Sequence, residues 1–368
     1  MSVESTPAAG AGLAERMRRE LERSLLRTRN GIRYVTSSPK VGATPRDVVW
    51  RRGRAELWRY HGGPIRYDPP LLFVPSIVSK SYILDLRPGS STVEFFLGQG
   101  LDVFLLDWGV PDERDAENTL ETYVDEYLPR AVAAVRRETG CDEVTLAGYC
   151  LGGVFGILYG AGREDAAVRN LILLATPIDF PVMGSWVAPI VEGRLNPEEL
   201  VDETGNIPAD AVYAGFYMQA PTKELAVYAT LLENLWNDEF VEGYQAMAQW
   251  SREQLPFPGA VAQQIAEEFV RKNVLVTGKM RLGPRVVDFA DFDGNVLNAF
   301  AEKDNVVVPA ASSPASELVG KPERRRELRL GGGHVTFATG SRAFNQTLPS
   351  IMEWLAEHSD VVDPPRER

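Results

Sequence analysis

The sequence predicts an α/β fold in which a mostly parallel central sheet is covered by helices on both faces. Apolar runs alternate with helical segments along most of the 368 residues. The runs 71–74, 101–107 and 171–174 are apolar almost throughout, as expected of strands buried on both faces. A glycine-rich turn at 148–153 then joins a strand directly to a helix. Hydrophobic residues make up 44% of the chain, which is enough for a large core.

The expected elements follow in chain order. A narrow stripe of Leu13, Met17, Leu21 and Leu25 predicts a basic amphipathic helix over 14–27, after a flexible start at 1–12. Because strands and helices alternate further on, we expect right-handed helical crossovers between parallel strands. Strands are expected within 47–60 and at 71–74, 101–107, 144–147, 171–174, 295–301 and 327–330, and helices over 120–139, 151–160 and 351–357.

The alternation stops after Thr176, and residues 180–289 are interrupted by proline and rich in large aromatic side chains. This composition favours a helical lid (cap) insertion over an apolar site, with an extra helical layer as the alternative. We therefore expect an N-terminal segment at 1–45, an α/β core at 46–179 and 290–368, and a lid at 180–289. The large side chains concerned are Trp186, Tyr213, Phe216, Tyr217, Met218, Tyr228, Leu231, Leu232, Trp236, Phe240, Tyr244, Met247 and Trp250.

Composition restricts the compartment and the partners. The chain has two cysteines and no apolar leader at its start, which favours a reducing, cytoplasmic location. No apolar run approaches the length of about 18 residues that spans a bilayer. The net charge of −12 argues against nucleic acid as a partner. Residues 1–60 nevertheless carry 13 Arg and Lys against 6 Asp and Glu, so they form either a solvated basic helix or a site for an anionic partner.

The segment Gly148-Tyr149-Cys150-Leu151-Gly152 predicts a nucleophile elbow. In that turn a strand passes into a helix through a strained nucleophile, and its neighbours two positions away must be small. Serine is the usual nucleophile, and here Cys150 takes its place. The alternative is that Cys150 is a buried structural thiol. The strand before the turn and the apolar run after it favour the catalytic interpretation.

A nucleophile in this turn needs a base, and the base needs a carboxylate to orient it. Of the three histidines, only His334 follows a late strand in a glycine cluster. Asp304 follows the strand at 295–301 more directly than its rivals Asp291 and Asp293. The order of cysteine, aspartate and histidine is that of the α/β-hydrolase fold. The oxyanion hole is expected to consist of the Leu151 amide and the amide of Ile77 or Val78, between which the sequence does not decide.

With these residues in place, the chain resembles the polyhydroxyalkanoate synthases over about residues 45–358. In length it is similar to the class whose catalytic subunit pairs with a second subunit. The family's nucleophilic cysteine, aspartate and histidine fall on Cys150, Asp304 and His334. The resemblance is carried by Pro75-Ser76-Ile77-Val78-Ser79-Lys80-Ser81-Tyr82-Ile83-Leu84-Asp85-Leu86, by residues 100–109 and 148–153, and by Pro256-Phe257-Pro258-Gly259 with Asn273.

The resemblance implies a poly(3-hydroxyalkanoate) polymerase whose substrates are a 3-hydroxyacyl-coenzyme A and a growing polyester chain. It further implies a second synthase subunit, a homo- or hetero-oligomer and a place at polymer granules. Coenzyme A enters as part of the substrate, and we expect no cofactor and no metal ion. A thiol-dependent hydrolase, either a polyester depolymerase or a thioesterase, is the alternative. Two departures lie beside the site, since Asn305 replaces the family's histidine and Val335-Thr336-Phe337 replaces a small, glycine-containing run.

Overall fold

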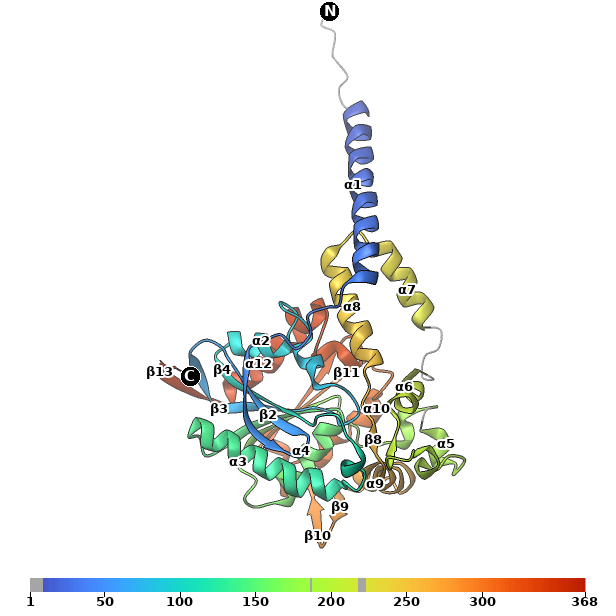
Figure 1. Ribbon diagram of the computed structural model, residues 1–368. Helices are drawn as coiled ribbons and strands as arrows, with labels where there is room; N and C mark the ends of the chain where they lie inside the picture. The colour runs from blue at the N-terminus through green and yellow to red at the C-terminus, as the bar shows by residue number, and fades with distance from the viewer. Residues whose placement is uncertain (1–8, 186, 218–222, 368) are drawn as a thin grey trace, which may run out of the picture. The chain divides into compact units, whose positions relative to one another are not determined.

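The computed structural model describes residues 9–185, 187–217 and 223–367 (Figure 1). The chain divides into two compact units, residues 1–40 with 220–249, and residues 41–219 with 250–368. Residues 1–8 of the expected flexible start, together with Trp186 and Met218 of the expected lid, lie outside the described residues. The side chains of 9–14, including that of Leu13, also lie outside the description.

The larger unit is built on one sheet with the strand order β1-β2-β4-β3-β5-β6-β11-β12. Neighbours from β4 to β12 pair in parallel, whereas β1 with β2 and β2 with β4 are antiparallel. The predicted mostly parallel sheet is therefore confirmed. Its strands are β1 (Arg46–Arg52), β2 (Ala55–Tyr60), β3 (Ile65–Val74), β4 (Leu101–Asp107), β5 (Val144–Tyr149), β6 (Val168–Leu174), β11 (Asn295–Ala301), β12 (Arg325–Leu330) and β13 (Asp360–Arg366).

Helices cover both faces of this sheet because successive strand residues point to opposite sides. Leu72 and Val74 of β3 belong to the core that packs under α3 (Leu128–Thr139) and α4 (Leu151–Gly162). Between them, Phe73 lies 5.9 Å from the ring of Phe96 on α2 (Thr92–Gly98), which packs with α12 (Leu348–Glu357) on the other face. Figure 1 shows these two pairs of helices on opposite sides of the strands.

Two strand features were not expected from the sequence. The C-terminal β13 pairs antiparallel with the first half of β3, where β5 does not reach. Within 180–289, which was expected to be helical, β9 (Lys279–Leu282) and β10 (Arg285–Asp288) form a hairpin. In β9, exposed Lys279 and Arg281 alternate with buried Met280 and Leu282, which is the period of a strand. The other elements are β7 (Asn206–Ile207), β8 (Phe257–Pro258), α5 (Ala188–Val191), α6 (Ala209–Tyr217), α9 (Gly259–Gln264), α10 (Pro309–Ser312) and α11 (Ala315–Leu318).

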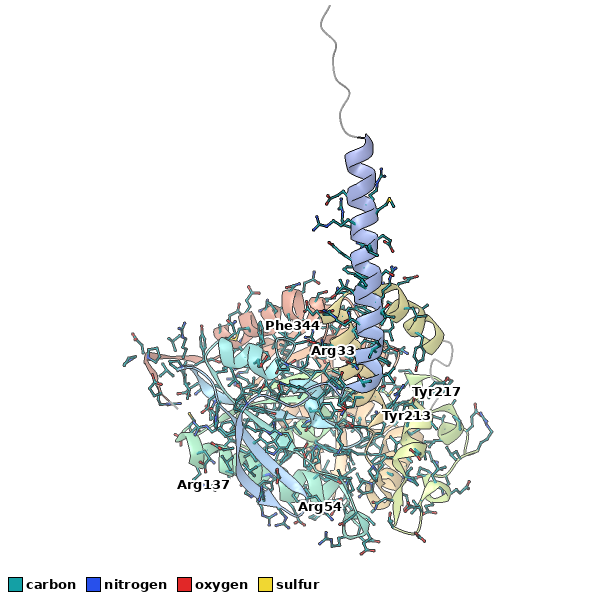
Figure 2. All side chains as sticks on the ribbon, turned by 45° about the horizontal axis from the view of Figure 1, so that its top comes forward. Arg33, Arg54, Arg137, Tyr213, Tyr217 and Phe344 are labelled. Atoms are coloured by element: carbon teal, nitrogen blue, oxygen red, sulfur yellow. The ribbon has the colours of Figure 1, made fainter. Side chains whose placement is uncertain are left out.

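The smaller unit consists of α1 (Ala9–Thr36), α7 (Lys223–Asn234) and most of α8 (Asp238–Arg252). The C-terminal half of α1 contacts α8 and the connection between α7 and α8. Arg29 forms an ion pair with Asp238, and the Asn30 side chain donates to the Leu235 carbonyl at 2.7 Å. Arg33, labelled in Figure 2, forms an ion pair with Glu242. The predicted helix over 14–27 is thus confirmed and is longer at both ends.

The predicted apolar stripe of α1 is exposed. Met17, Leu21 and Leu25 keep 66%, 64% and 65% of their surface accessible. Arginines at 16, 18, 19, 23 and 27 flank the stripe. Three of them pair with glutamates of the same helix, Arg18 with Glu22, Arg19 with Glu15 and Arg27 with Glu20, so this part of the helix is apolar with a small excess of positive charge.

Candidate active site

Cys150 occupies a strained turn between β5 and α4. Its φ of 55° and ψ of −122° lie outside the regions that L-residues prefer. Glycines allow the surrounding backbone to pack this closely. A Cβ atom on Gly152 would come 1.9 Å from the carbonyl oxygen of Val74, and one on Gly153 would come 1.8 Å from Thr176 Oγ1. The local structure is therefore that of the predicted nucleophile elbow.

The structure places the side chain of His334 against that of Asp304. His334 follows β12, and its Nδ1 lies 2.8 Å from Oδ2 of Asp304. Asp304 follows β11 and is buried, and its other oxygen, Oδ1, accepts the amides of Val306 and Val307 at 2.8 and 2.9 Å. Both carboxylate oxygens thus have fixed partners. The rivals Asp291 and Asp293 are exposed, and Asp293 lies beside Arg324.

The thiol of Cys150 is the other neighbour of the imidazole. Burial by itself lowers the pKa of His334, but the Asp304 carboxylate and the interaction with Cys150 outweigh it and raise the pKa. The imidazole therefore connects the carboxylate to the thiol. An imidazole in this position could exchange a proton with the thiol, and the deprotonated sulfur is the nucleophilic form of a cysteine.

The expected oxyanion donors lie around the same turn. Leu151 is the first residue of α4, so its amide belongs to the set that has no partner within the helix. Ile77 and Val78 are buried in the loop after β3. Two residues from a later part of the chain fix the position of this loop by hydrogen bonds. The Leu255 amide donates to the Val78 carbonyl at 3.1 Å, and the Trp250 indole donates to the Lys80 carbonyl at 2.8 Å. Both loop amides remain candidates for the second donor.

The two departures from the family pattern occupy different environments. Asn305 is exposed. Val335-Thr336-Phe337 belong to a short 3-10 helix, His334–Phe337, in which Phe337 is fully buried and its carbonyl accepts the hydroxyl of Thr92 at 3.0 Å. The buried Phe337 ring and the hydrogen bond to its carbonyl thus anchor the segment that carries His334.

The remaining histidines and the second cysteine have other partners. His61 lies beside Asp47, His358 Nδ1 lies 2.8 Å from the Trp354 carbonyl, and the Cys141 thiol lies 3.3 Å from Asp68 Oδ1. Among the described residues, no cluster of His, Cys, Asp and Glu could hold a metal ion. In the same part of the chain, no helix is long and apolar enough to cross a membrane.

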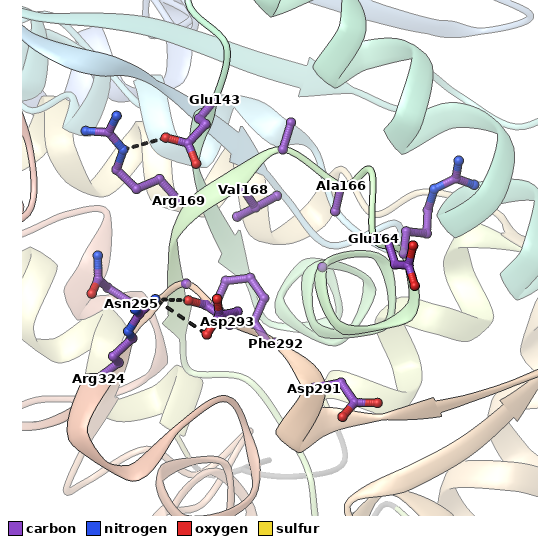
Figure 3. Close-up of a pocket in the computed structure, with 14 residues that line it drawn as sticks. Glu143, Glu164, Ala166, Val168, Arg169, Asp291, Phe292, Asp293, Asn295 and Arg324 are labelled. Carbon is purple, nitrogen blue, oxygen red and sulfur yellow. Dashed lines mark hydrogen bonds and ion pairs between the residues drawn. The ribbon is translucent and has the colours of Figure 1, made fainter.

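A cavity of about 540 Å³ opens at the amino ends of the central strands, at the other end of the sheet from Cys150 (Figure 3). It is lined by Glu143, which precedes β5, and by the first residues of β6 and β11. Its arginines already have acidic partners, since Arg169 pairs with Glu143 and Arg163 with Asp165. This polar cavity lies at the amino ends of the strands, whereas Cys150, Asp304 and His334 follow their carboxyl ends.

Comparison with known proteins now identifies the family. Residues 69–341 match the family described as alpha/beta hydrolase fold, and residues 12–96 match the N-terminus of poly-beta-hydroxybutyrate polymerase (PhaC). The poly(3-hydroxyalkanoate) polymerase subunit PhaC of Haloferax mediterranei is 33% identical over 89% of this chain and 67% of the relative. That of Allochromatium vinosum is 32% identical over 86% of this chain and 89% of the relative. The chain belongs to the PhaC family.

This membership makes the chain an acyltransferase of polyhydroxyalkanoate biosynthesis, and it confirms the resemblance found in the sequence. Solved structures support the fold alone. A putative lipase from Sulfolobus solfataricus superimposes with a TM-score of 0.53 and 14% identity over 85% of this chain and 99% of the lipase. The thioesterase domain from the curacin biosynthetic pathway gives a TM-score of 0.50 and 11% identity over 86% of this chain and all of that domain. The predicted α/β-hydrolase fold is confirmed.

Proposed function

We propose that this PhaC chain transfers 3-hydroxyacyl groups from coenzyme A thioesters to a growing polyester, with Cys150 as nucleophile, His334 as base and Asp304 as the orienting carboxylate. The observation that carries this proposal is the position of the His334 ring, which has Asp304 on Nδ1 and the Cys150 thiol as its other partner. This is the arrangement of an activated nucleophile whose base is held by a third group.

Two acyl transfers complete a cycle. In the first, the Cys150 thiolate attacks the thioester carbonyl, a bond forms from its sulfur to the acyl carbon, and the bond to coenzyme A breaks as His334 gives the leaving thiolate a proton. In the second, His334 removes the proton of a chain-end hydroxyl, whose oxygen attacks the acyl-enzyme and releases the Cys150 thiolate. The first transfer exchanges one thioester for another, whereas the second yields a more stable oxoester. The second step therefore drives elongation.

Charge develops on the acyl oxygen during each attack. The Leu151 amide, together with that of Ile77 or Val78, would donate to this oxygen, and removal of one such donor typically costs about a hundredfold or more in rate. Asp304 would stabilise the imidazolium that forms when His334 holds the proton. No cofactor or metal ion takes part in this scheme.

Residues 180–289 serve, in this proposal, as a lid that keeps water from the acyl-enzyme, on an α/β core of 46–179 and 290–368. The hydrogen bonds from Trp250 and Leu255 to the loop at 76–80 support a link between this insertion and the oxyanion donors. Exclusion of water favours attack by a chain-end hydroxyl over hydrolysis. If the lid has this role, replacing 180–289 by a short linker raises the ratio of soluble hydroxy acid to polymer, and an unchanged ratio argues against it.

The exposed apolar and basic face of α1 supports a second part of the proposal, a docking helix for another synthase subunit. The relatives from Haloferax and Allochromatium carry the word subunit in their names. A surface that combines Met17, Leu21 and Leu25 with flanking arginines suits a partner helix with an apolar stripe and acidic flanks. The assembly would then work in the cytoplasm at the surface of polyester granules.

The deciding experiment incubates the purified chain with 3-hydroxybutyryl-coenzyme A, with and without a PhaC-associated second subunit, and follows free coenzyme A, insoluble polymer and soluble 3-hydroxybutyrate. The proposal predicts polymer that accounts for the released coenzyme A, with a lag or weak activity in the absence of the second subunit. Release of coenzyme A with only soluble 3-hydroxybutyrate would instead identify a thioesterase.

A further inference from the structure

We infer that Tyr149, the residue before the nucleophile, is a positioning residue that keeps the His334 imidazole where it can exchange a proton with the Cys150 thiol. This inference rests on the proposed function, because it assigns Tyr149 a part in the same base-catalysed transfers. Tyr149 is the last residue of β5 and is only 2% exposed. It belongs to no pair or triad of catalytic side chains, so the Gly-x-Cys-x-Gly spacing alone gives it no role.

Tyr149 contacts His334 in two independent ways. Its hydroxyl donates to the backbone carbonyl of His334 at 3.0 Å. Its ring also stacks on the imidazole, with centroids 5.2 Å apart and planes inclined by 29°. Such an offset pair of rings is attractive beyond the area that it buries. One side chain therefore fixes both the main chain and the ring of the base.

The segment before His334 explains why such a contact is needed. Three glycines, 331–333, precede the histidine, and Gly332 has a φ of 112° that only glycine adopts readily. Asp304 and Cys150 are partners of the ring nitrogens, which lie on the edge of the imidazole, so neither supports the face of the ring. The stacked Tyr149 ring provides that support. Phe337 also contacts the tyrosine, with ring centroids 6.5 Å apart and planes inclined by 58°.

The position of Tyr149 in the chain couples the base to the nucleophile. The residue is paired in the sheet with Leu174, and the next amide, that of Cys150, donates to the Leu174 carbonyl at 2.9 Å. Both residues are thus carried by the same rigid strand end. A displacement of His334 away from Cys150 must break a contact with the residue directly before Cys150. Proton transfer depends steeply on this geometry.

Tyr159 provides a matched control. It lies on α4, is also 2% exposed, and donates its hydroxyl to the backbone carbonyl of Ala166 at 2.8 Å, outside the group formed by Cys150, His334 and Asp304. Tyr149→Phe and Tyr159→Phe therefore each remove one buried bond from a phenol to a backbone carbonyl. The two variants should lose similar amounts of thermal stability, so any difference in turnover reports the position of the bond.

The experiment measures kcat and KM for 3-hydroxybutyryl-coenzyme A in both variants, with Cys150→Ala alongside. We expect Tyr149→Phe to lower kcat about tenfold, the effect of one hydrogen bond lost in the transition state, and to leave KM unchanged. Tyr159→Phe should remain within about twofold of the parent. Tyr149→Leu also loses the stacked ring, so its turnover should be slower than that of Tyr149→Phe. Its Cys150 should also react more slowly with iodoacetamide. Phenylalanine, which keeps the ring but not the hydroxyl, should therefore restore part of the activity that leucine loses.

Equal kcat in Tyr149→Phe and Tyr159→Phe, with Cys150→Ala inactive, overturns the inference and leaves the proposed function standing. A tenfold rise in KM with kcat unchanged also overturns it, because that pattern indicates a contact with substrate. Turnover retained in Cys150→Ala overturns the proposed function together with the inference. If Tyr149→Leu does not fold, the comparison of the two phenylalanine variants still decides.

Discussion

The two ends of β5 each have a cysteine nearby, and the two thiols lie in opposite environments. Cys141, three residues before the strand, lies beside the Asp68 carboxylate, and burial together with that negative charge raises the pKa of its thiol. Cys150, directly after the strand, lies beside an imidazole whose pKa is itself raised. Arg366 also reaches the Cys141 sulfur at 4.0 Å, but it is paired with Asp68, and burial with the Asp68 carboxylate outweighs it. Both thiols are partly exposed, and of the two only Cys150 has an imidazole beside it that could accept its proton.

The two ends of the parallel strands also differ in how their charged and polar side chains are arranged. At the amino ends, an open cavity is lined by charged side chains, among which Arg169 pairs with Glu143 and Arg324 with Asp293 (Figure 3). At the carboxyl ends, three polar side chains from three strands meet in a largely buried group. In the cavity the charges of Arg169 and Glu143 neutralise each other, whereas the three side chains at the carboxyl ends can pass a proton from one to the next, which is why we place the proposed chemistry there.

The largest expected effect separates the two cysteines. Cys150→Ala should abolish coenzyme A release from 3-hydroxybutyryl-coenzyme A, a loss of roughly a thousandfold or more, because no covalent intermediate can form. Cys141→Ala should remain within about twofold of the parent. Circular dichroism checks that both variants are folded. Equal losses in the two variants would show that the comparison of the two thiols is wrong.

A second prediction compares the glycine turns on either side of β5. Gly152→Ala should destabilise the fold by about 3 kcal/mol or more, because its Cβ would lie 1.9 Å from a backbone oxygen that cannot move freely. Gly140 has a φ of 74° but no atom within 4 Å of an added Cβ, so Gly140→Ala should cost only about 1 kcal/mol. Urea unfolding measures both. A Gly152→Ala variant as stable as Gly140→Ala contradicts the close packing of the elbow.

A third prediction uses the pH dependence of alkylation. Burial and the Asp68 carboxylate raise the pKa of Cys141 and keep that thiol protonated at neutral pH, whereas the Cys150 thiol has the His334 imidazole beside it as a partner for its proton. At pH 7, iodoacetamide should therefore modify Cys150 at least about tenfold faster than Cys141, and the ratio should fall as pH rises and Cys141 ionises. Both residues lie in one tryptic peptide, 138–163, so fragmentation must locate the label. A ratio that rises with pH would reverse the assignment.

The sequence predicted most of the sheet because local signals mark its strands. Strand–turn–helix patterning singled out Cys150, and position after late strands singled out Asp304 and His334. The structure brings these three side chains together, and their catalytic roles remain a proposal. The hairpin β9–β10 and strand β13 were missed, since short runs with charged residues or prolines read as loops unless the pairing partner is known. The contact between Tyr149 and His334 was also missed, because its acceptor is a backbone carbonyl 185 residues away.

The sequence could not decide whether the amide of Ile77 or that of Val78 is the second oxyanion donor. Both follow the same strand and both are buried, and the loop that carries them is held by Trp250 and Leu255 from a distant part of the chain. Sequence spacing places the loop at the carboxyl edge of the sheet but does not orient individual amides. The direction of an amide depends on tertiary contacts that no local pattern encodes.

The most direct test of the account captures the acyl-enzyme in Asp304→Asn, in a Cys141→Ala background. A thiol needs less help from a base than a hydroxyl does, so this variant should still acylate but should not extend the chain. After addition of 3-hydroxybutyryl-coenzyme A, we predict a burst of about one coenzyme A per site and one hydroxybutyryl group on Cys150 by mass spectrometry, and no further turnover. Steady turnover near the parent rate, or an acyl group on any other residue, would contradict the account.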